Sequence, residues 1–264
     1  MRGVLSEICA SRRSDVATAK AEVSLDELES AVREAESARP FLSALEEAAR
    51  RRGHGLICES KRRSPSGGEL RPDLDAGEAA RFFVEGGAAC LSVLTEPRFF
   101  GGGWSDLQGA RAAVGVPVLR KDFILDAWQV AETRALGADC LLLILAALDD
   151  VHARELEAQA IGYGLDVLIE VMSFGELERA LGMRSRLVGV NNRDLETLET
   201  DMVRGSELIA LAVEGGGFVV GESGLRGAED LRGQRDAGAR GFLVGEHLMR
   251  SADIAVATRE LAEA

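Results

Sequence analysis

Cysteine and histidine are scarce in this chain of 264 residues, which has only four cysteines and three histidines. No two cysteines form a CxxC pair, and the histidines lie too far apart for metal-ligand spacing. We therefore expect no metal site and no disulfide framework. Three of the cysteines lie in short apolar runs, which predicts buried, reduced thiols at Cys58, Cys90 and Cys140.

Long apolar runs and an excess of positive charge are missing too. The longest apolar run, residues 140–147, suits a buried strand and is far too short to cross a membrane. The first fifteen residues contain no long apolar segment, so we expect no secretory signal and a cytoplasmic location. The net charge of −13 argues against a nucleic-acid partner, although cations gathered in a cleft can still bind a small anion.

What the chain does contain is a repeated pattern of short apolar runs that end abruptly in polar or charged residues. These runs centre near Leu56, Leu91, Val118, Leu142, Leu168, Val188, Val219 and Leu243. Helical patterns separate or follow them at 75–85, 105–113, 126–136, 149–163, 174–181, 202–213, 226–237 and 251–264. Strand–helix alternation predicts parallel βαβ units, and eight of them predict a closed (β/α)₈ TIM barrel, with a doubly wound sheet as the competing arrangement. Charge at the end of a buried strand is unfavourable unless it lines a shared site, so the pattern also predicts an enzyme.

Roughly fifty residues of helical pattern precede the first strand, with a candidate N-cap at Ser24 and a break at Pro40. We expect residues 1–264 to form one domain, with 1–50 as an N-terminal helical extension. The extension can cap the bottom or side of the barrel, or its helices can lean over the mouth of the site. The expected C′ glycines of the barrel helices are Gly86, Gly137, Gly164, Gly215 and Gly238.

Two strand ends carry the lysines that are most informative about chemistry. Glu59 and Lys61 are two residues apart and therefore point the same way from their strand. Lys121 alternates with Arg120 and Asp122, so these neighbours can pair outside the barrel while Lys121 faces inward. A buried lysine held by carboxylates is a credible general acid.

Three further groups complete the candidate site. Glu170 ends the fifth strand and is either a proton-transfer group or the counter-ion of the two lysines, while Asn191 can orient a substrate or a carboxylate. Arg193 and Asp194 are more often a loop-anchoring pair than catalytic groups. The arginine-rich loop 62–68 suits an anionic substrate.

Glycine-bearing turns follow the seventh and eighth strands. Ser223, Gly224 and Gly245 lie where main-chain N–H groups can approach a phosphate at the start of a short helix. Glu246 is awkward beside a phosphate, so its side chain is expected to point away and only its N–H to be usable.

With these residues assembled, the chain closely resembles the indole-3-glycerol-phosphate synthase family of tryptophan biosynthesis. The resemblance runs nearly from end to end and rests on ESKRRSPS (59–66), LSVLTEPRFFGG (91–102), LRKDFILD (119–126), LIEV (168–171), GVNNRDLETLETD (189–201), GESGL (221–225) and LVGEHLMRS (243–251). The chain departs from the family pattern at Ser60, Gly221, where serine is expected, and Met172. The N-terminal helices resemble the family's extension, which packs around the mouth of the barrel.

The resemblance implies a carboxy-lyase that closes a ring in 1-(2-carboxyphenylamino)-1-deoxyribulose 5-phosphate, with loss of carbon dioxide and water and without cofactor or metal. It implies Lys121 as the general acid, Glu170 as the acid/base group for dehydration, and Lys61 as its salt-bridge partner, a phosphate contact or a second acid. The resemblance also implies Glu59 and Asn191 as positioning groups. The residues that it implies for binding substrate and phosphate are Ser64, Arg193, Ser223, Gly224, Gly245 and Glu246. It implies an apolar pocket formed by Phe100, Phe123, Leu142, Leu195 and Pro65, although ordinary core packing would explain these five residues equally well.

Two alternatives remain from the sequence. Phosphoribosylanthranilate isomerase is another small phosphate-binding barrel, but it would need a Cys/Asp acid–base pair, and Cys58 should face away from the site. A catalytically silent barrel that binds a phosphorylated metabolite would not need buried acid/base groups. The sequence is compatible with a monomer and with contacts to other enzymes of the pathway.

Overall fold

Eight parallel strands close into a barrel within the described residues, which are 3–65 and 67–264 of a computed structural model. Around the barrel the order is β1, β10, β9, β8, β7, β6, β5 and β4, so each strand neighbours the next one of the barrel along the chain. The strands are β1 (Gly55–Ser60), β4 (Cys90–Leu94), β5 (Val118–Lys121), β6 (Cys140–Ile144), β7 (Asp166–Val171), β8 (Leu187–Asn191), β9 (Phe218–Glu222) and β10 (Gly241–Val244). All eight contain a predicted strand centre, so the TIM-barrel prediction is confirmed and the doubly wound sheet is wrong.

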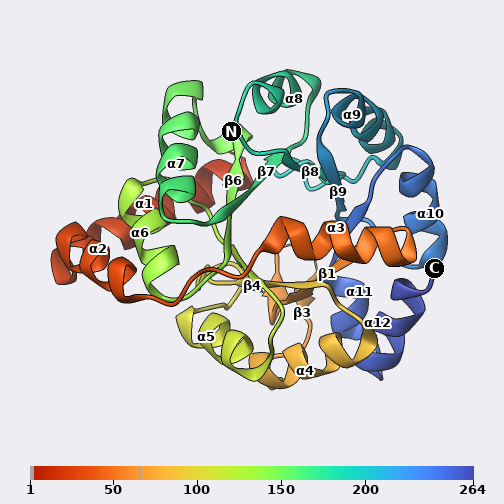
Figure 1. The fold of residues 1–264 in the computed structure, drawn as a ribbon, viewed down its shortest axis with the longest axis horizontal. Helices are drawn as coiled ribbons and strands as arrows, with labels where there is room; N and C mark the ends of the chain where they lie inside the picture. The colour runs from red at the N-terminus through yellow and green to blue at the C-terminus, as the bar shows by residue number, and fades with distance from the viewer. Residues whose placement is uncertain (1–2, 66) are drawn as a thin grey trace.

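Helices cover the outside of the barrel (Figure 1). They are α4 (Ala76–Gly86), α5 (Trp104–Ala113), α6 (Ala127–Ala135), α7 (Asp150–Gly162), α8 (Phe174–Leu181), α9 (Met202–Glu214), α10 (Ala228–Asp236) and α12 (Ile254–Ala262). Short elements are β2 (Arg63–Ser64) and β3 (Gly68–Glu69) in the first loop, the 3₁₀ turn Leu145–Ala147, and α11 (Glu246–Arg250) after β10. Six of the barrel helices begin with a side chain that caps main-chain N–H groups, namely Asp75, Asp126, Asp149, Ser173, Asp201 and Asp253.

Two of the five predicted C′ glycines are displaced by one residue. Gly87 and Gly216, with φ of 104° and 84°, take the left-handed conformation expected of Gly86 and Gly215. Gly86 is instead the last residue of α4, where a Cβ would lie 2.6 Å from the carbonyl oxygen of Ala255 in α12. Its glycine serves close helix packing, which local turn patterns do not reveal.

The N-terminal extension reaches both ends of the barrel. It consists of α1 (Val4–Glu22), α2 (Leu25–Glu34), capped by the predicted Ser24, and α3 (Phe41–Arg52), which begins directly after the predicted break at Pro40. Figure 1 shows α3 crossing in front of the barrel strands and α2 lying beside α6. At the end where the strands begin, Asp139 accepts a hydrogen bond from the main-chain N–H of Arg39, just before α3, and Asp166 accepts one from that of Leu42, in the first turn of α3.

The core lies inside the barrel and between the strands and helices. Nearly every strand residue is buried, including Cys58, Cys90 and Cys140, as predicted. Burial on both faces explains why the strands read as continuous apolar runs in the sequence. Within the described part of the chain, no helix combines the length and hydrophobicity needed to cross a lipid bilayer.

Candidate active site

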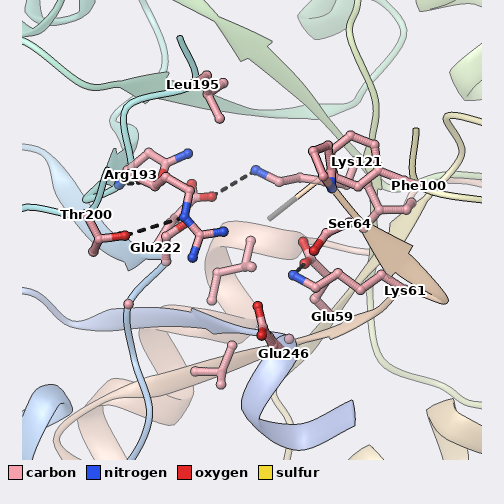
Figure 2. Close-up of a pocket in the computed structure, with 18 of the residues that line it drawn as sticks. Glu59, Lys61, Ser64, Phe100, Lys121, Arg193, Leu195, Thr200, Glu222 and Glu246 are labelled. Carbon is pink, nitrogen blue, oxygen red and sulfur yellow. Dashed lines mark hydrogen bonds and ion pairs between the residues drawn. The ribbon is translucent and has the colours of Figure 1, made fainter. Parts of the chain in front are cut away.

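A cavity of about 790 Å³ opens at the carboxyl ends of the barrel strands (Figure 2). All sixteen site residues proposed from the sequence line it: Glu59, Lys61, Ser64, Pro65, Phe100, Lys121, Phe123, Leu142, Glu170, Asn191, Arg193, Leu195, Ser223, Gly224, Gly245 and Glu246. Residues that are far apart in the chain thus converge because parallel strands place all their carboxyl ends at one face. The extension contributes Val4, Leu5 and Ile8 of α1, so α1 leans over the mouth while α3 covers the opposite end.

Lys121 is the centre of the charged half of the cavity. Its Nζ lies 2.6 Å from Oε2 of Glu170 and 2.8 Å from Oε2 of Glu222. Burial alone would lower the pKa of Lys121, but the negative charges of Glu170, Glu222 and Glu59 outweigh burial and raise this pKa above its ordinary value. Lys121 is therefore a protonated, internally held ammonium group.

The second lysine forms its own pair. Lys61 Nζ lies 2.7 Å from Oε1 of Glu59, as their shared strand face predicts. Glu59 also accepts a hydrogen bond from Ser92 on the neighbouring strand β4. Burial acts to raise the pKa of Glu59, yet Lys61 and Lys121 lower it overall, which keeps this carboxylate ionised. Glu170 thus pairs with Lys121, and Glu59 pairs with Lys61.

Glu222 is a functional candidate that was not predicted from the sequence. It ends β9, it is 1% exposed, and burial together with the charge of Glu170 raises its pKa to about 8 although Lys121 opposes the shift. Gly189 on β8 makes room for it, because a Cβ there would lie 2.2 Å from Oε1 of Glu222. The signal was present, since Glu222 follows an apolar run as Glu59 and Glu170 do. The glycines around it favour a phosphate-binding interpretation of this segment, which does not involve the carboxylate.

Asn191 links Glu170, on β7, to the loop after β8. Its Nδ2 donates to Glu170 over 3.2 Å and its Oδ1 accepts from the main-chain N–H of Arg193. Arg193 donates to Thr200 Oγ1 across the same loop, and Asp194 Oδ1 accepts from the N–H groups of Glu196 and Thr197. Asp194 therefore anchors the loop, whereas Arg193 faces the cavity (Figure 2).

Behind Lys121 lies a buried ionic network on the opposite face of β5. Asp122 pairs with Arg120 at 2.9 Å, as alternation predicts, and with Arg12 of α1 through two bonds of 2.8 and 2.7 Å. These arginines lower the pKa of Asp122 to about 2 even though burial alone would raise it. The network fixes both the strand end that carries Lys121 and the helix that lines the mouth.

The part of the cavity that the sequence predicts to bind phosphate consists of main-chain turns. Ser223 and Gly224 follow β9 with φ of 59° and 74°, and Gly245 forms the N-cap of α11. A Cβ at Gly245 would lie 2.7 Å from Oε1 of Glu59, so only glycine fits beside the Glu59–Lys61 pair. The carboxylate of Glu246 is engaged by Arg250 at 3.0 Å, which leaves the main chain at the start of α11 as the feature suited to an anion.

The apolar half of the cavity holds the predicted pocket residues. The rings of Phe100 and Phe123 lie 6.2 Å apart, and Pro65, Leu142 and Leu195 line the same space. Ser64, which lines the same cavity, accepts a hydrogen bond from the N–H of Gly67 and so also stabilises the turn of the first loop. Ser66 lies outside the described residues.

Glu96 shapes the loop that carries Phe100 and was not predicted from the sequence. This carboxylate is fully buried and accepts hydrogen bonds from the N–H groups of Arg98, Phe99 and Phe100 at 3.0, 2.7 and 3.0 Å. The guanidinium of Arg62 donates to the carbonyl of Gly101 in the same loop, over 3.2 Å. The loop that carries Phe100 is therefore held from inside by the carboxylate of Glu96 and from outside by Arg62 of the first loop.

Comparison with known proteins decides the family. The profile of "Indole-3-glycerol phosphate synthase" matches residues 5–261. A protein of that name from Rhizorhabdus wittichii is 50% identical over 261 residues, covering 99% of this chain and 98% of its own, and one from Azospirillum brasilense is 48% identical, covering 99% of each. The chain belongs to the indole-3-glycerol phosphate synthase family. Members of this family are carboxy-lyases of tryptophan biosynthesis that bind a small phosphorylated substrate.

Solved structures with low sequence identity share the barrel of this synthase-family chain. A 3-hexulose-6-phosphate synthase matches with a TM-score of 0.63 and 17% identity, over 79% of this chain and 98% of its own. Thiamine phosphate pyrophosphorylase from Pyrococcus furiosus matches with a TM-score of 0.59 and 20% identity, over 80% of this chain and 95% of its own. At these identities the likeness concerns the fold alone.

The isomerase alternative does not fit the site of this synthase-family chain. Cys58 has no exposed surface, and burial raises the pKa of its thiol well above the ordinary value, so it cannot serve as an exposed acid. Residues 3–65 and 67–264 bring no three His, Cys, Asp or Glu side chains together in a way that would hold a metal ion.

Proposed function

We propose that this chain performs the ring closure of its family on 1-(2-carboxyphenylamino)-1-deoxyribulose 5-phosphate, through the residues described below. The aromatic carbon attacks the ketone, carbon dioxide leaves the ring, and a hydroxyl leaves as water to give indole-3-glycerol phosphate. The atoms balance with protons, carbon dioxide and water alone. Lys121, held at 2.6 and 2.8 Å by two carboxyl groups, is the observation that carries this proposal.

Lys121 protonates the ketone oxygen as the new carbon–carbon bond forms. Its neighbours keep it charged in the resting site, and a developing alkoxide nearby is basic enough to take the proton. The fixed position also matters, because an ammonium group already oriented by Glu170 and Glu222 needs little reorganisation during the reaction.

Glu170 and Glu222 divide the remaining proton transfers. Glu170, held by Lys121 and Asn191, accepts and returns the proton needed for loss of the hydroxyl. Glu222 is largely protonated at neutral pH, since its pKa is raised to about 8 by burial. With Glu222 neutral, the two ammonium groups of Lys61 and Lys121 balance the two carboxylates of Glu59 and Glu170, so the cavity accepts an anionic substrate without net repulsion.

The two halves of the cavity hold the two ends of the substrate. The apolar half, with Phe100 and Phe123, receives the anthranilate ring. The main-chain turns at Ser223–Gly224 and Gly245 bind the phosphate, with Lys61 and the first loop supplying positive charge. Holding both ends brings the aromatic carbon to the ketone, which accounts for much of the rate enhancement expected of a ring closure.

The test of the proposed function is direct. The pure protein mixed with the carboxyphenylamino ribulose phosphate should generate indole fluorescence with nothing added. In the Lys121→Met variant, turnover should fall on the order of a hundredfold to ten-thousandfold while binding of an unreactive substrate analogue largely persists. Near-normal turnover in this variant would remove Lys121 from its role, and no product with the native protein would favour the silent barrel. A cytoplasmic location stays a prediction.

A further inference from the structure

A second asparagine, Asn192, lies directly after Asn191, on the other side of the strand end. Asn192 is fully buried behind the cavity wall, whereas Asn191 lines the cavity. The Nδ2 group of Asn192 donates to two successive main-chain carbonyls, those of Glu222 at 2.8 Å and Ser223 at 2.9 Å. Its Oδ1 accepts from Nε2 of Gln234 in α10 at 2.7 Å. Both ends of the amide are therefore engaged.

This contact determines where the next N–H groups point. In a trans peptide the N–H is directed opposite to the preceding C=O. Because Asn192 draws the carbonyls of residues 222 and 223 toward itself, the N–H groups of Ser223 and Gly224 point away from it, on the cavity side of the turn. Ser223 has φ of 59°, a conformation that costs a non-glycine residue free energy and persists where its surroundings enforce it.

The protein makes space for this arrangement at two glycines. A Cβ at Gly205 in α9 would lie 1.7 Å from Oδ1 of Asn192, and a Cβ at Gly221 would lie 2.0 Å from Oε1 of Gln234. Gly221 is also the position where the family resemblance leads one to expect serine. In this chain, Gln234 occupies the space that a side chain at position 221 would need.

We propose that Asn192, oriented by Gln234, is a positioning residue that fixes the turn after β9 so that the main-chain N–H groups of Ser223 and Gly224 bind the substrate phosphate. Asn192 touches no substrate atom and acts through the turn alone. The inference rests on the proposed assignment of the phosphate to this turn, and it explains how a strained serine is kept in place there.

The experiment measures phosphate preference rather than activity. Calorimetry gives the affinity for the substrate analogue whose ketone is reduced to an alcohol, with and without its 5-phosphate, and the ratio of the two is the phosphate preference. Asn192→Asp keeps the size of the side chain but removes both donors, and Asn192→Ser is too short to reach both carbonyls. Each should lower the preference about tenfold to a hundredfold, with KM raised more than kcat is lowered. Gln234→Leu, which leaves Asn192 in place but unanchored, should give a smaller loss.

Asn191→Ser is the matched control, since it makes the same change one residue earlier on the other face. It should impair turnover through Glu170, and because the turn at Ser223–Gly224 keeps its anchor, it should lower the phosphate preference less than Asn192→Ser does. An unchanged preference in folded Asn192→Ser would overturn the positioning role, and should the Asn192 variants fail to fold, an unchanged preference in Gln234→Leu would do so. If the native protein itself shows no phosphate preference, the proposed phosphate site is wrong and the inference falls with it.

Discussion

Replacing Glu222 by glutamine should simplify the pH dependence of this protein in a way that few single substitutions would. The glutamine keeps the shape of the neutral carboxyl group and still lies beside Lys121, but it cannot ionise. In the native site burial raises the pKa of Glu222 from 4.5 to about 8. About nine in ten molecules therefore carry the proton at pH 7, and about one in ten at pH 9.

Activity provides the first measurement. Above pH 8, ionised Glu222 adds a negative charge to a cavity that must receive an anionic substrate, so native kcat/KM should fall with an apparent pKa near 8. The pH dependence of kcat/KM reports the pKa values of groups in the free enzyme, which is the state that the structure represents. In Glu222→Gln that fall should be absent, and kcat/KM should stay level until another group titrates.

Stability provides an independent measurement of the same ionisation. Between pH 4.5 and about 8 the folded state retains a proton that the unfolded chain has released, so this group makes the free energy of unfolding decrease as pH rises. The slope is about 1.4 kcal/mol per pH unit, and the accumulated loss is on the order of 3–5 kcal/mol. Denaturant titrations should therefore find Glu222→Gln similar to the native protein at pH 4.5 and more stable at pH 9. If the variant retains the alkaline fall in kcat/KM, or loses stability with pH as the native protein does, Glu222 is not the group responsible.

Three other predictions follow from neighbouring features. Gly245→Asp should weaken the binding of phosphorylated ligands far more than that of a dephosphorylated analogue, because the new side chain would collide with the Glu59–Lys61 ion pair. Equal losses of affinity in calorimetry would count against a phosphate site at Gly245. The pKa of Asp122 is lowered from 3.8 to about 2, so its ionised form stabilises the fold above pH 3.8 by about 2 kcal/mol, and this contribution disappears as pH falls through 2. In Asp122→Asn, denaturant titrations should no longer find this decrease in the free energy of unfolding at acid pH. The variant should also unfold more easily than the native protein at pH 7. Glu96→Gln retains a single acceptor oxygen for three N–H groups and should raise KM about tenfold with a smaller change in kcat, with recovery in Glu96→Asp; an unchanged KM would mean that the Phe100 loop holds its shape unaided.

Most of the barrel could be predicted because buried parallel strands and their covering helices leave strong local signals. Each strand centre lies inside an observed strand, and β1 and β5 show the side-chain alternation expected at Glu59, Lys61 and Lys121. The displaced glycine of α4 is different in kind, because its identity depends on a helix more than 160 residues away along the chain. Local patterns carry no information about such contacts.

The same limit applies to the site. Strand-end charges could be collected from the sequence, but their pairing could not, since alternation gives a direction and not a distance. Glu222 and Glu96 show this most clearly: one is a carboxylate among glycines and the other a surface-type residue in a polar loop, and only the folded barrel buries both. The placement of the N-terminal helices at two ends of the barrel likewise depends on side-chain pairs such as Arg12 and Asp122.

That pair spans 110 residues of sequence. During synthesis α1 emerges first, yet its anchor on β5 does not exist until nearly half of the chain has been made. The wall of the cavity that α1 supplies is therefore completed late, after a long loop has closed at considerable entropic expense. The barrel itself closes later still, because β1 pairs with β10, the last of its strands to be made. Competence for ligand is therefore expected only when both of these long-range contacts have formed.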